Sequence, residues 1–266
     1  MIEVTVDQLY GWIIMYVWPF FRLVALFSVA PLFGERSVPV HFKIGLAAVA
    51  AMLIAPVLPP PPTVGPTSYE GLLIIMQQVT IGLALGFVMK IVFMAIQTAG
   101  ELIGLQMGLS FASFFTQDVG SSNVLSRFLG VTAILLFLAF NVHIMVIEML
   151  VESFKWLPIG SSVMSNGGWW RLTAFGGFLF SASLMLALPI MTALLLINFA
   201  MAVLNRVAPQ FSIYSVGFAI TLLSGMVLMT AMHNGFGPLF TRFFEAGLTT
   251  MRDVAMMLAP SRSAGP

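Results

Sequence analysis

Long apolar stretches separated by short polar turns make up most of the chain. They cover residues 9–30, 44–58, 71–99, 124–154, 172–207 and 211–258. A helix rises about 1.5 Å per residue, so roughly 20 residues cross the hydrocarbon core of a bilayer. Only residues 44–58 fall short of that length. The pattern predicts an all-α membrane protein.

Helix-breaking residues interrupt this pattern at several points. Pro19, Pro189 and Pro238 lie inside apolar stretches, where a proline removes a backbone hydrogen bond and bends the helix. The sequence NGFG at residues 234–237 adds a break to the last stretch, and the PPPP run at residues 59–62 predicts a stiff, extended connector. We interpret the run as a spacer, with a ligand for a proline-binding partner as the alternative. The expected fold is a set of irregular helical hairpins with interrupted helices.

The stretch at residues 100–123 changes character midway. Gly100, Gly104 and Gly108 are four residues apart, so on a helix they form one smooth face that another backbone can approach closely. After Gly108 the composition shifts to serine and phenylalanine, and then to residues that favour turns and helix caps. We predict a helix that gives way to a loop with an apolar beginning.

Such a loop cannot face lipid, because each unpaired backbone group in hydrocarbon costs several kcal/mol. It therefore lies outside the bilayer, or it lines or blocks a path through the membrane. In the first case it is an ordinary loop whose phenylalanines dock on the protein. Composition alone leaves both interpretations open.

Overall composition narrows the class of protein. Of the 266 residues, 59% are hydrophobic and 8% are charged, against roughly 25% charged residues in soluble domains. The formal net charge is +1 and no basic run occurs, so we expect no nucleic-acid partner. The chain has no cysteine, which excludes disulfides, thiol catalysis and Cys-ligated metals.

Three charged residues fall within or next to the predicted helices, where a charge is costly unless it faces protein or water. These intramembrane polar residues are Arg22, Lys90 and Glu101. Arg22 either faces a subunit partner or extends toward the membrane interface. His143 and Glu148 share a predicted helix five residues apart, and we favour hydrogen bonds between helices over a proton relay.

No catalytic motif is present. The sequence lacks HExxH, GxSxG, P-loop and GxGxxG patterns, and its three histidines fall in separate segments. We therefore expect no enzyme activity, no catalytic residue, no cofactor and no metal site. A transporter usually has two matching halves, whereas here irregular segments with a long central loop precede a plain hairpin. A subunit of a larger conduit fits this asymmetry better than a transporter does.

The best internal boundary follows LPIG at residues 157–160. Residues 161–171 are rich in Ser, Gly and Trp and are predicted as a linker with an interfacial aromatic pair, Trp169 and Trp170. We therefore divide the chain into an irregular part at residues 1–160, a helical hairpin at residues 172–259 and a disordered tail at residues 260–266.

Several stretches resemble the FliR family, the export-gate subunits of flagellar and virulence-type type III secretion. The matching sequences are spread over the chain in the family's order: FSVAPLFG (27–34), GELIGLQMGLSFA (100–112), LPIG (157–160), LNRVAPQ (204–210), GF (217–218) and LLSG (222–225). The flagellar branch resembles the chain more than the virulence (injectisome) branch does.

The resemblance implies a single copy joined to five copies of FliP and four of FliQ, with FlhB and FlhA as further partners. Residues 1–160 would be FliP-like and residues 172–259 FliQ-like. The assembly would sit in membrane lipid of the bacterial inner membrane, within the flagellar basal body and raised toward the periplasm. Its cargo would be unfolded polypeptides.

The resemblance also assigns a channel plug to residues 106–123. Our hypothesis is that an apolar seal excludes ions and yields to an exported chain; it contains Gln106, Met107, Phe111, Phe114 and Phe115. The residues expected to act as hinges or close-packing positions are Gly100, Gly104, Gly108 and Gly120. Relatives often carry Asp-Pro in the plug, whereas this chain has TQDV at residues 116–119. A proton-coupled transporter using Arg22, Lys90 and Glu101 is the rival interpretation.

Overall fold

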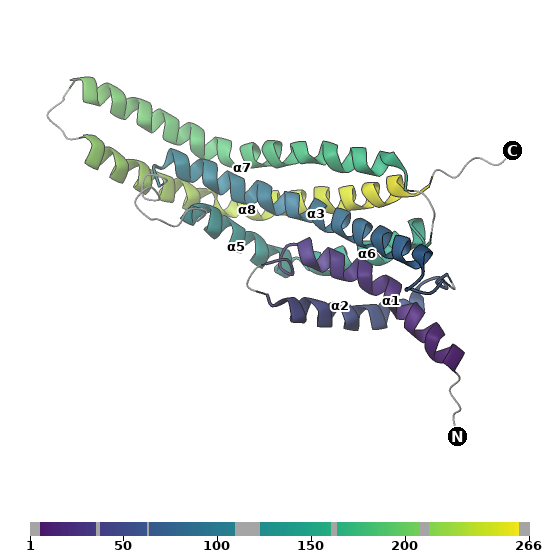
Figure 1. The fold of residues 1–266 in the computed structure, drawn as a ribbon. Coiled ribbons are helices and arrows are strands. Elements are labelled where there is room, and N and C mark those ends of the chain that lie inside the picture. Colours follow the sequence, from purple (N-terminus) through teal and green to yellow (C-terminus); the bar gives the residue numbers. More distant parts are fainter. Residues whose placement is uncertain are drawn as a thin grey trace. The chain divides into compact units, whose positions relative to one another are not determined.

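The computed structural model describes residues 6–35, 38–62, 64–109, 123–160, 164–207 and 213–260. Within these ranges the regular structure is entirely helical, without a strand (Figure 1). The helices are α1 (Val6–Val29), α2 (Val40–Ile54), the 3-10 helix η1 (Ala55–Val57), α3 (Tyr69–Gln106), α5 (Val124–Ala139), α6 (Val142–Trp156), α7 (Asn166–Val207) and α8 (Ile213–Leu258). The predicted class, an all-α membrane protein with interrupted helices, is confirmed.

Three of the described helical segments are long and apolar enough to cross a membrane. They are Val40–Val57, Tyr69–Gln106 and Asn166–Val207. The first consists of α2 together with η1 and reaches 18 residues, so this segment is longer than the apolar pattern predicted. The number rises to five if the bent pairs α5 with α6 and the two parts of α8 each count as one span.

The helix breaks fall partly where the sequence predicts them. The expected single helix over residues 124–154 is two helices, because Asn141 adopts the left-handed conformation with φ 56° between α5 and α6. Helix α8 bends between Gly217–His233 and Gly235–Leu258, at the predicted NGFG break. The predicted linker at residues 161–171 is too long, since α7 already begins at Asn166 and includes both tryptophans.

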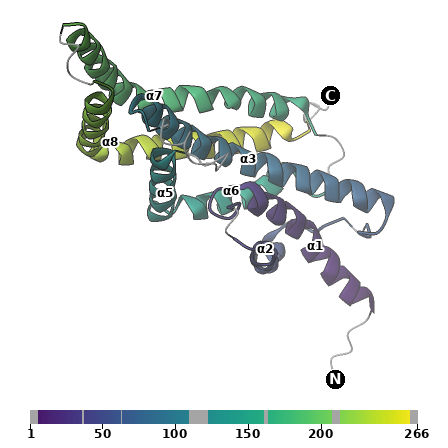
Figure 2. The ribbon, with the colours of Figure 1, turned by 60° about the vertical axis from the view of Figure 1, so that its left-hand side comes forward.

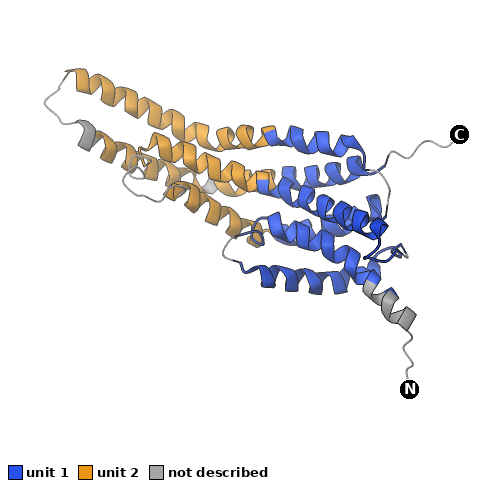
Figure 3. Ribbon diagram, viewed as in Figure 1, with its two compact units in different colours: residues 1–90, 141–176, 245–266 blue, residues 91–140, 177–244 orange. Residues whose placement is uncertain are grey.

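The chain forms two compact units (Figure 3). Unit 1 contains residues 1–90, 141–176 and 245–266, and unit 2 contains residues 91–140 and 177–244. Helices α3, α7 and α8 each contribute one part to each unit. The division into sequential FliP-like and FliQ-like parts stays a prediction.

Unit 1 is built around α1. Helices α1 and α2 lie side by side (Figures 1 and 2), and the buried residues Trp18, Ile14 and Ile74 form a core beside them. Helix α3 approaches α1 at its glycines: a Cβ atom at Gly82 would lie 2.3 Å from the carbonyl oxygen of Arg22. The four-residue spacing of Gly82 and Gly86 therefore serves close helix packing.

Unit 2 has an aromatic centre. The rings of Phe93 on α3, Phe137 on α5 and Phe244 on α8 form a mutual cluster with centroid distances of 5.3, 5.7 and 5.6 Å. All three side chains are buried. Aromatic pairs at these distances contribute about 0.5–1.5 kcal/mol beyond their burial, so this cluster fixes the helices that carry the candidate site.

Candidate functional site

Helix α3 is terminated by a glycine in the left-handed backbone conformation. Gly108 has φ 80°, and its N–H donates to the carbonyl of Leu105 at 3.1 Å while Leu109 donates to the carbonyl of Gly104 at 2.9 Å. This pair of bonds is the Schellman pattern of helix termination, which favours glycine at this position. Gly108 therefore ends α3 and is not part of its packing face.

Helix α5 begins with an equally well-defined cap. The side-chain Oδ1 of Asn123 accepts a hydrogen bond from the N–H of Leu125 at 2.9 Å, which satisfies one of the free donors of the first turn. Residues 110–122 connect these two capped helix ends and lie outside the described residues, so the positions of Phe111, Phe114, Phe115 and Gly120 are not described.

The two capped ends lie against each other. A Cβ atom at Gly104 would meet the side-chain nitrogen of Asn123 at 1.6 Å, and one at Gly100 would meet the Cα of Ser126 at 2.5 Å. A side chain at Gly100 would push the backbone of α5 away from α3, whereas one at Gly104 would displace the side chain of Asn123. The chain therefore leaves α3 and returns to α5 at one place, and Gly100 and Gly104 are close-packing positions.

Met107 anchors this end of α3 to α8. Its side chain is 3% exposed and lies over Gly225, where a Cβ atom would be 2.6 Å from the methionine sulfur. The hydroxyl of Thr221 lies 3.4 Å from the carbonyl of Met107 and also within hydrogen-bond distance of the carbonyls of Gly217 and Phe218 on its own helix, at 3.1 and 3.0 Å. Methionine is flexible enough to fill an irregular socket of this kind, and a side chain at position 225 would displace it from its present position.

Two cavities of unit 2 adjoin this anchor. The first has a volume of about 630 Å³, and the residues that line it include Gln106, Asn198, Asn205 and Thr221. The second has a volume of about 410 Å³ and is mainly apolar, with Met107, Leu109, Phe128 and Met226 among its lining residues. Residues 105–109 thus contribute to both cavities, of which the first combines three side-chain amides with apolar residues and the second is almost entirely apolar.

The two charged residues predicted on α3 are exposed. Lys90 and Glu101 both lie on the surface of the chain, and Glu101 accepts a hydrogen bond of 3.5 Å from the hydroxyl of Ser126 on α5. Because α3 is long and apolar enough to span a membrane, a charge on its surface needs water or another protein beside it.

Arg22 lies in unit 1, where it is fully buried. Its guanidinium donates to Oε1 of Gln78 at 2.8 Å, to Oγ of Ser153 at 2.9 Å and to the carbonyl of Leu157 at 2.9 Å. The group also sits 3.8 Å from the ring centroid of Phe154. Among the described residues no carboxylate pairs with Arg22, so neutral acceptors and a ring face hold this charge.

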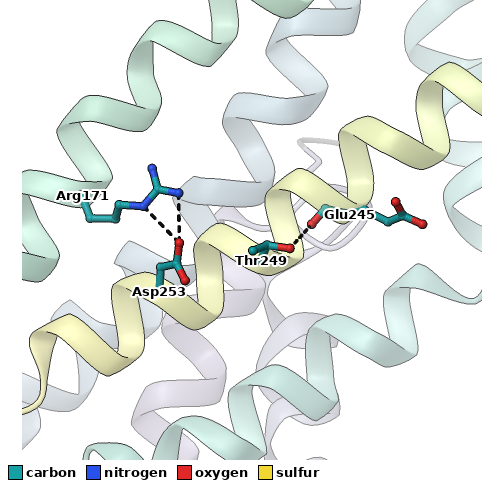
Figure 4. A network of polar contacts seen from close by, with 4 residues as sticks. All are labelled: Arg171, Glu245, Thr249 and Asp253. Carbon is teal, nitrogen blue, oxygen red and sulfur yellow. Dashed lines mark hydrogen bonds and ion pairs between the residues drawn. The ribbon is translucent and has the colours of Figure 1, made fainter.

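A second polar network joins the start of α7 to the end of α8 in unit 1 (Figure 4). Arg171 donates from Nε and Nη2 to one oxygen of Asp253, at 3.2 and 3.0 Å. One turn earlier on α8, Thr249 donates to the carbonyl of Glu245 at 2.8 Å. The two side chains of the ion pair are 35% and 33% exposed, so the pair orients the helices more than it stabilises them.

The described residues contain no group of three His, Asp or Glu side chains that could hold a metal ion. Three of the stretches that carry the sequence resemblance meet at the end of α3. Gln106 comes from GELIGLQMGLSFA, Asn205 from LNRVAPQ and Phe218 from GF, and all three line the larger cavity.

Comparison with known proteins assigns the family. Residues 13–247 match the family model of bacterial export proteins, family 1. The chain belongs to this family. It is 43% identical over 256 residues to the flagellar biosynthetic protein FliR of Escherichia coli (strain K12), which covers 96% of this chain and 97% of that protein. FliR of Pectobacterium carotovorum is 43% identical over 94% of this chain, and FliR of Bacillus subtilis is 25% identical over 91%.

Membership of the bacterial export proteins confirms the resemblance predicted from the sequence. The structure brings Gln106, Met107, Gly100, Gly104 and Gly108 together in unit 2 and places Arg22 in unit 1. Sequence reasoning missed Thr221 and Gly225, which receive Met107. The LLSG stretch was the available signal for Gly225, because a glycine on an apolar helix often marks a close contact.

Proposed function

We propose that this chain is the single-copy FliR subunit of a flagellar type III export gate and that residues 106–123 plug its channel. The similarity to FliR along nearly the full length of both chains supports the role in flagellar export. The arrangement of the two helix ends is the observation that supports the proposed plug. Gly108 and Asn123 begin and end the connecting segment at one packed junction, so a change within the segment need not disturb α3 or α5.

The partners follow from the same proposal. Five copies of FliP and four of FliQ would complete the assembly, FlhB and FlhA would join it, and unfolded polypeptides would pass through it. The assembly would lie in the inner membrane, within the flagellar basal body, and part of it would be raised toward the periplasm. Large apolar side chains exposed on α2 and α7, such as Phe42, Leu53, Leu196 and Phe199, offer the area that neighbouring subunits or lipid would cover.

A proton-coupled transporter is less well supported. That alternative uses Arg22, Lys90 and Glu101 as contacts along a pathway, but Arg22 is fully buried and already donates to three acceptors. The virulence-type export gate remains the alternative within the family. Every relative named above carries a flagellar name, which favours the flagellar assembly.

Deletion of residues 110–120 tests the plug. Cells that carry the deletion should take up small solutes that the intact membrane excludes, while export of flagellar proteins continues in part. A matched variant keeps the length and changes only Phe111, Phe114 and Phe115 to serine, which separates loss of the apolar seal from a shortened loop. A membrane that stays tight in both variants would refute the plug.

The assembly is tested separately. The chain purified in mild detergent from membranes that also contain FliP and FliQ should have the mass of a large hetero-oligomer with one copy of this chain. A monomer or homodimer would refute the subunit role.

A further inference from the structure

Three side-chain amides line the larger cavity of unit 2. Gln106 from the end of α3 and Asn198 and Asn205 from α7 line it, and within the described residues none of the three side chains forms a hydrogen bond. The lining residues carry no charge. Each amide offers one carbonyl acceptor and two N–H donors, so the cavity combines both hydrogen-bonding roles without selecting for a charge.

The spacing of the two asparagines matches an extended polypeptide. Asn198 and Asn205 are seven residues apart on α7, which places them on one face about 10.5 Å apart. An extended chain advances about 3.3 Å per residue, so this distance corresponds to about three residues. Met201 and Ala202 lie between the asparagines along the same cavity wall. A flexible thioether and a small side chain accept varied neighbours.

The physical need for such a surface follows from the cargo of the proposed gate. The backbone N–H and C=O groups of an unfolded polypeptide lose water where they cross an apolar constriction, at a cost of several kcal/mol for each unpaired group. Main-chain hydrogen bonds are independent of side-chain identity. Amides beside the seal can therefore satisfy the backbone of any exported sequence.

We propose that the amide-lined groove formed by Gln106, Asn198, Asn205 and Thr221 binds the backbone of exported polypeptides in extended form. This inference rests on the proposed export function and adds a binding site to it. The volume of about 630 Å³ lies within the range of pockets that enclose small molecules, so it can hold a few residues of a polypeptide. The groove adjoins Met107, so a polypeptide bound in it would lie directly beside the anchored end of the proposed plug.

Site-specific photo-crosslinking in intact cells tests the groove. The photoreactive residue p-benzoylphenylalanine replaces Asn198 or Asn205, and the matched control replaces Phe199, which is on the same helix and 69% exposed. The probe is an exported flagellar polypeptide stalled in the gate by a C-terminal green fluorescent protein domain. We expect crosslinks to the stalled polypeptide from positions 198 and 205 and none from position 199.

Other outcomes would refute the binding groove or the export function, and the two refutations can be told apart. Crosslinks from positions 198 and 205 only to other gate subunits, or to another segment of this chain, overturn the groove. Equal yields from all three positions also overturn it. A reference probe at Phe114 separates the two proposals: crosslinks from position 114 alone refute the groove and leave the export function standing. If the stalled polypeptide blocks export yet crosslinks from none of these positions, both proposals fail.

Substitution of single amides gives an independent measurement. Asn205→Leu keeps the size of the side chain and removes its hydrogen bonds, so crosslinking from position 198 should fall by about fivefold, the effect of losing one hydrogen bond of about 1 kcal/mol. Asn205→Gln keeps the amide and should restore the yield. Unchanged crosslinking in Asn205→Leu at equal chain levels would refute the role of the amide.

Discussion

The contact between α3 and α5 can be tested by adding one methyl group. In Gly100→Ala the new Cβ atom would lie 2.5 Å from the Cα of Ser126, 2.8 Å from its nitrogen and 2.9 Å from the carbonyl oxygen of Leu125. All three atoms belong to the backbone of α5, so no side chain can rotate away. The helices must separate by about 1 Å to reach ordinary contact distances of roughly 3.5 Å.

The expected loss of stability follows from two opposing contributions. Overpacking of a close contact costs about 1–3 kcal/mol, and a clash with backbone places this change near 3 kcal/mol. Inside a helix, alanine is more favourable than glycine by about 1 kcal/mol of folding free energy. The net loss in the free energy of unfolding is therefore about 2 kcal/mol. Gly176→Ala is the matched control, because a Cβ atom at Gly176 would meet nothing within 4 Å and only the helix gain remains.

Thermal unfolding of the chain in mild detergent, followed by tryptophan fluorescence, measures both changes. The midpoint should fall by about 4–8 °C in Gly100→Ala and rise by about 2–4 °C in Gly176→Ala. If Gly100→Ala raises the midpoint as the control does, α3 and α5 are not in backbone contact at this glycine.

Three further changes test the other contacts. Arg22→Met leaves three buried acceptors unpaired and should lower the free energy of unfolding by about 3–5 kcal/mol, measured by denaturant titration; an unchanged midpoint would refute the Arg22 network. Gly225→Ala should displace Met107 and lower the free energy of unfolding by about 1 kcal/mol. In a chain that already carries Met107→Ala, Gly225→Ala should cause no further loss. Strictly additive losses would contradict the contact between Met107 and Gly225. A double-mutant cycle between Arg171 and Asp253 should give a coupling below about 1 kcal/mol that falls with added salt, and a larger, salt-insensitive coupling would contradict the surface pair.

Local sequence patterns predicted the features that depend on neighbours along the chain. The four-residue spacing of Gly100 and Gly104 indicated a close-packing face, and the structure uses both glycines in this way. The breaks at Gly108 and at residues 234–237 follow from the same local chemistry, because glycine favours helix ends and bends.

Long-range partners could not be predicted in this way. Arg22 is separated by 56 residues from Gln78 and by 131 from Ser153, and no periodicity links residues so far apart. From the sequence, Arg22 was expected to face a subunit partner or to extend toward the membrane interface. In the structure it is enclosed by its own chain. Asn141 was also missed, since an asparagine within an apolar run predicts a buried polar residue more readily than a left-handed break.

The contacts around Met107 explain how a plug could move without loosening the chain. Under the proposed function the seal must open for each exported polypeptide and close again, so its contacts must be weaker than those that hold its ends. Those ends are held by backbone packing at Gly100, by the Asn123 cap and by the Met107 socket on Gly225. None of these contacts uses residues 110–122. Substitutions at the held ends should therefore destabilise the chain, whereas substitutions between them should change leakage and leave the unfolding midpoint in place.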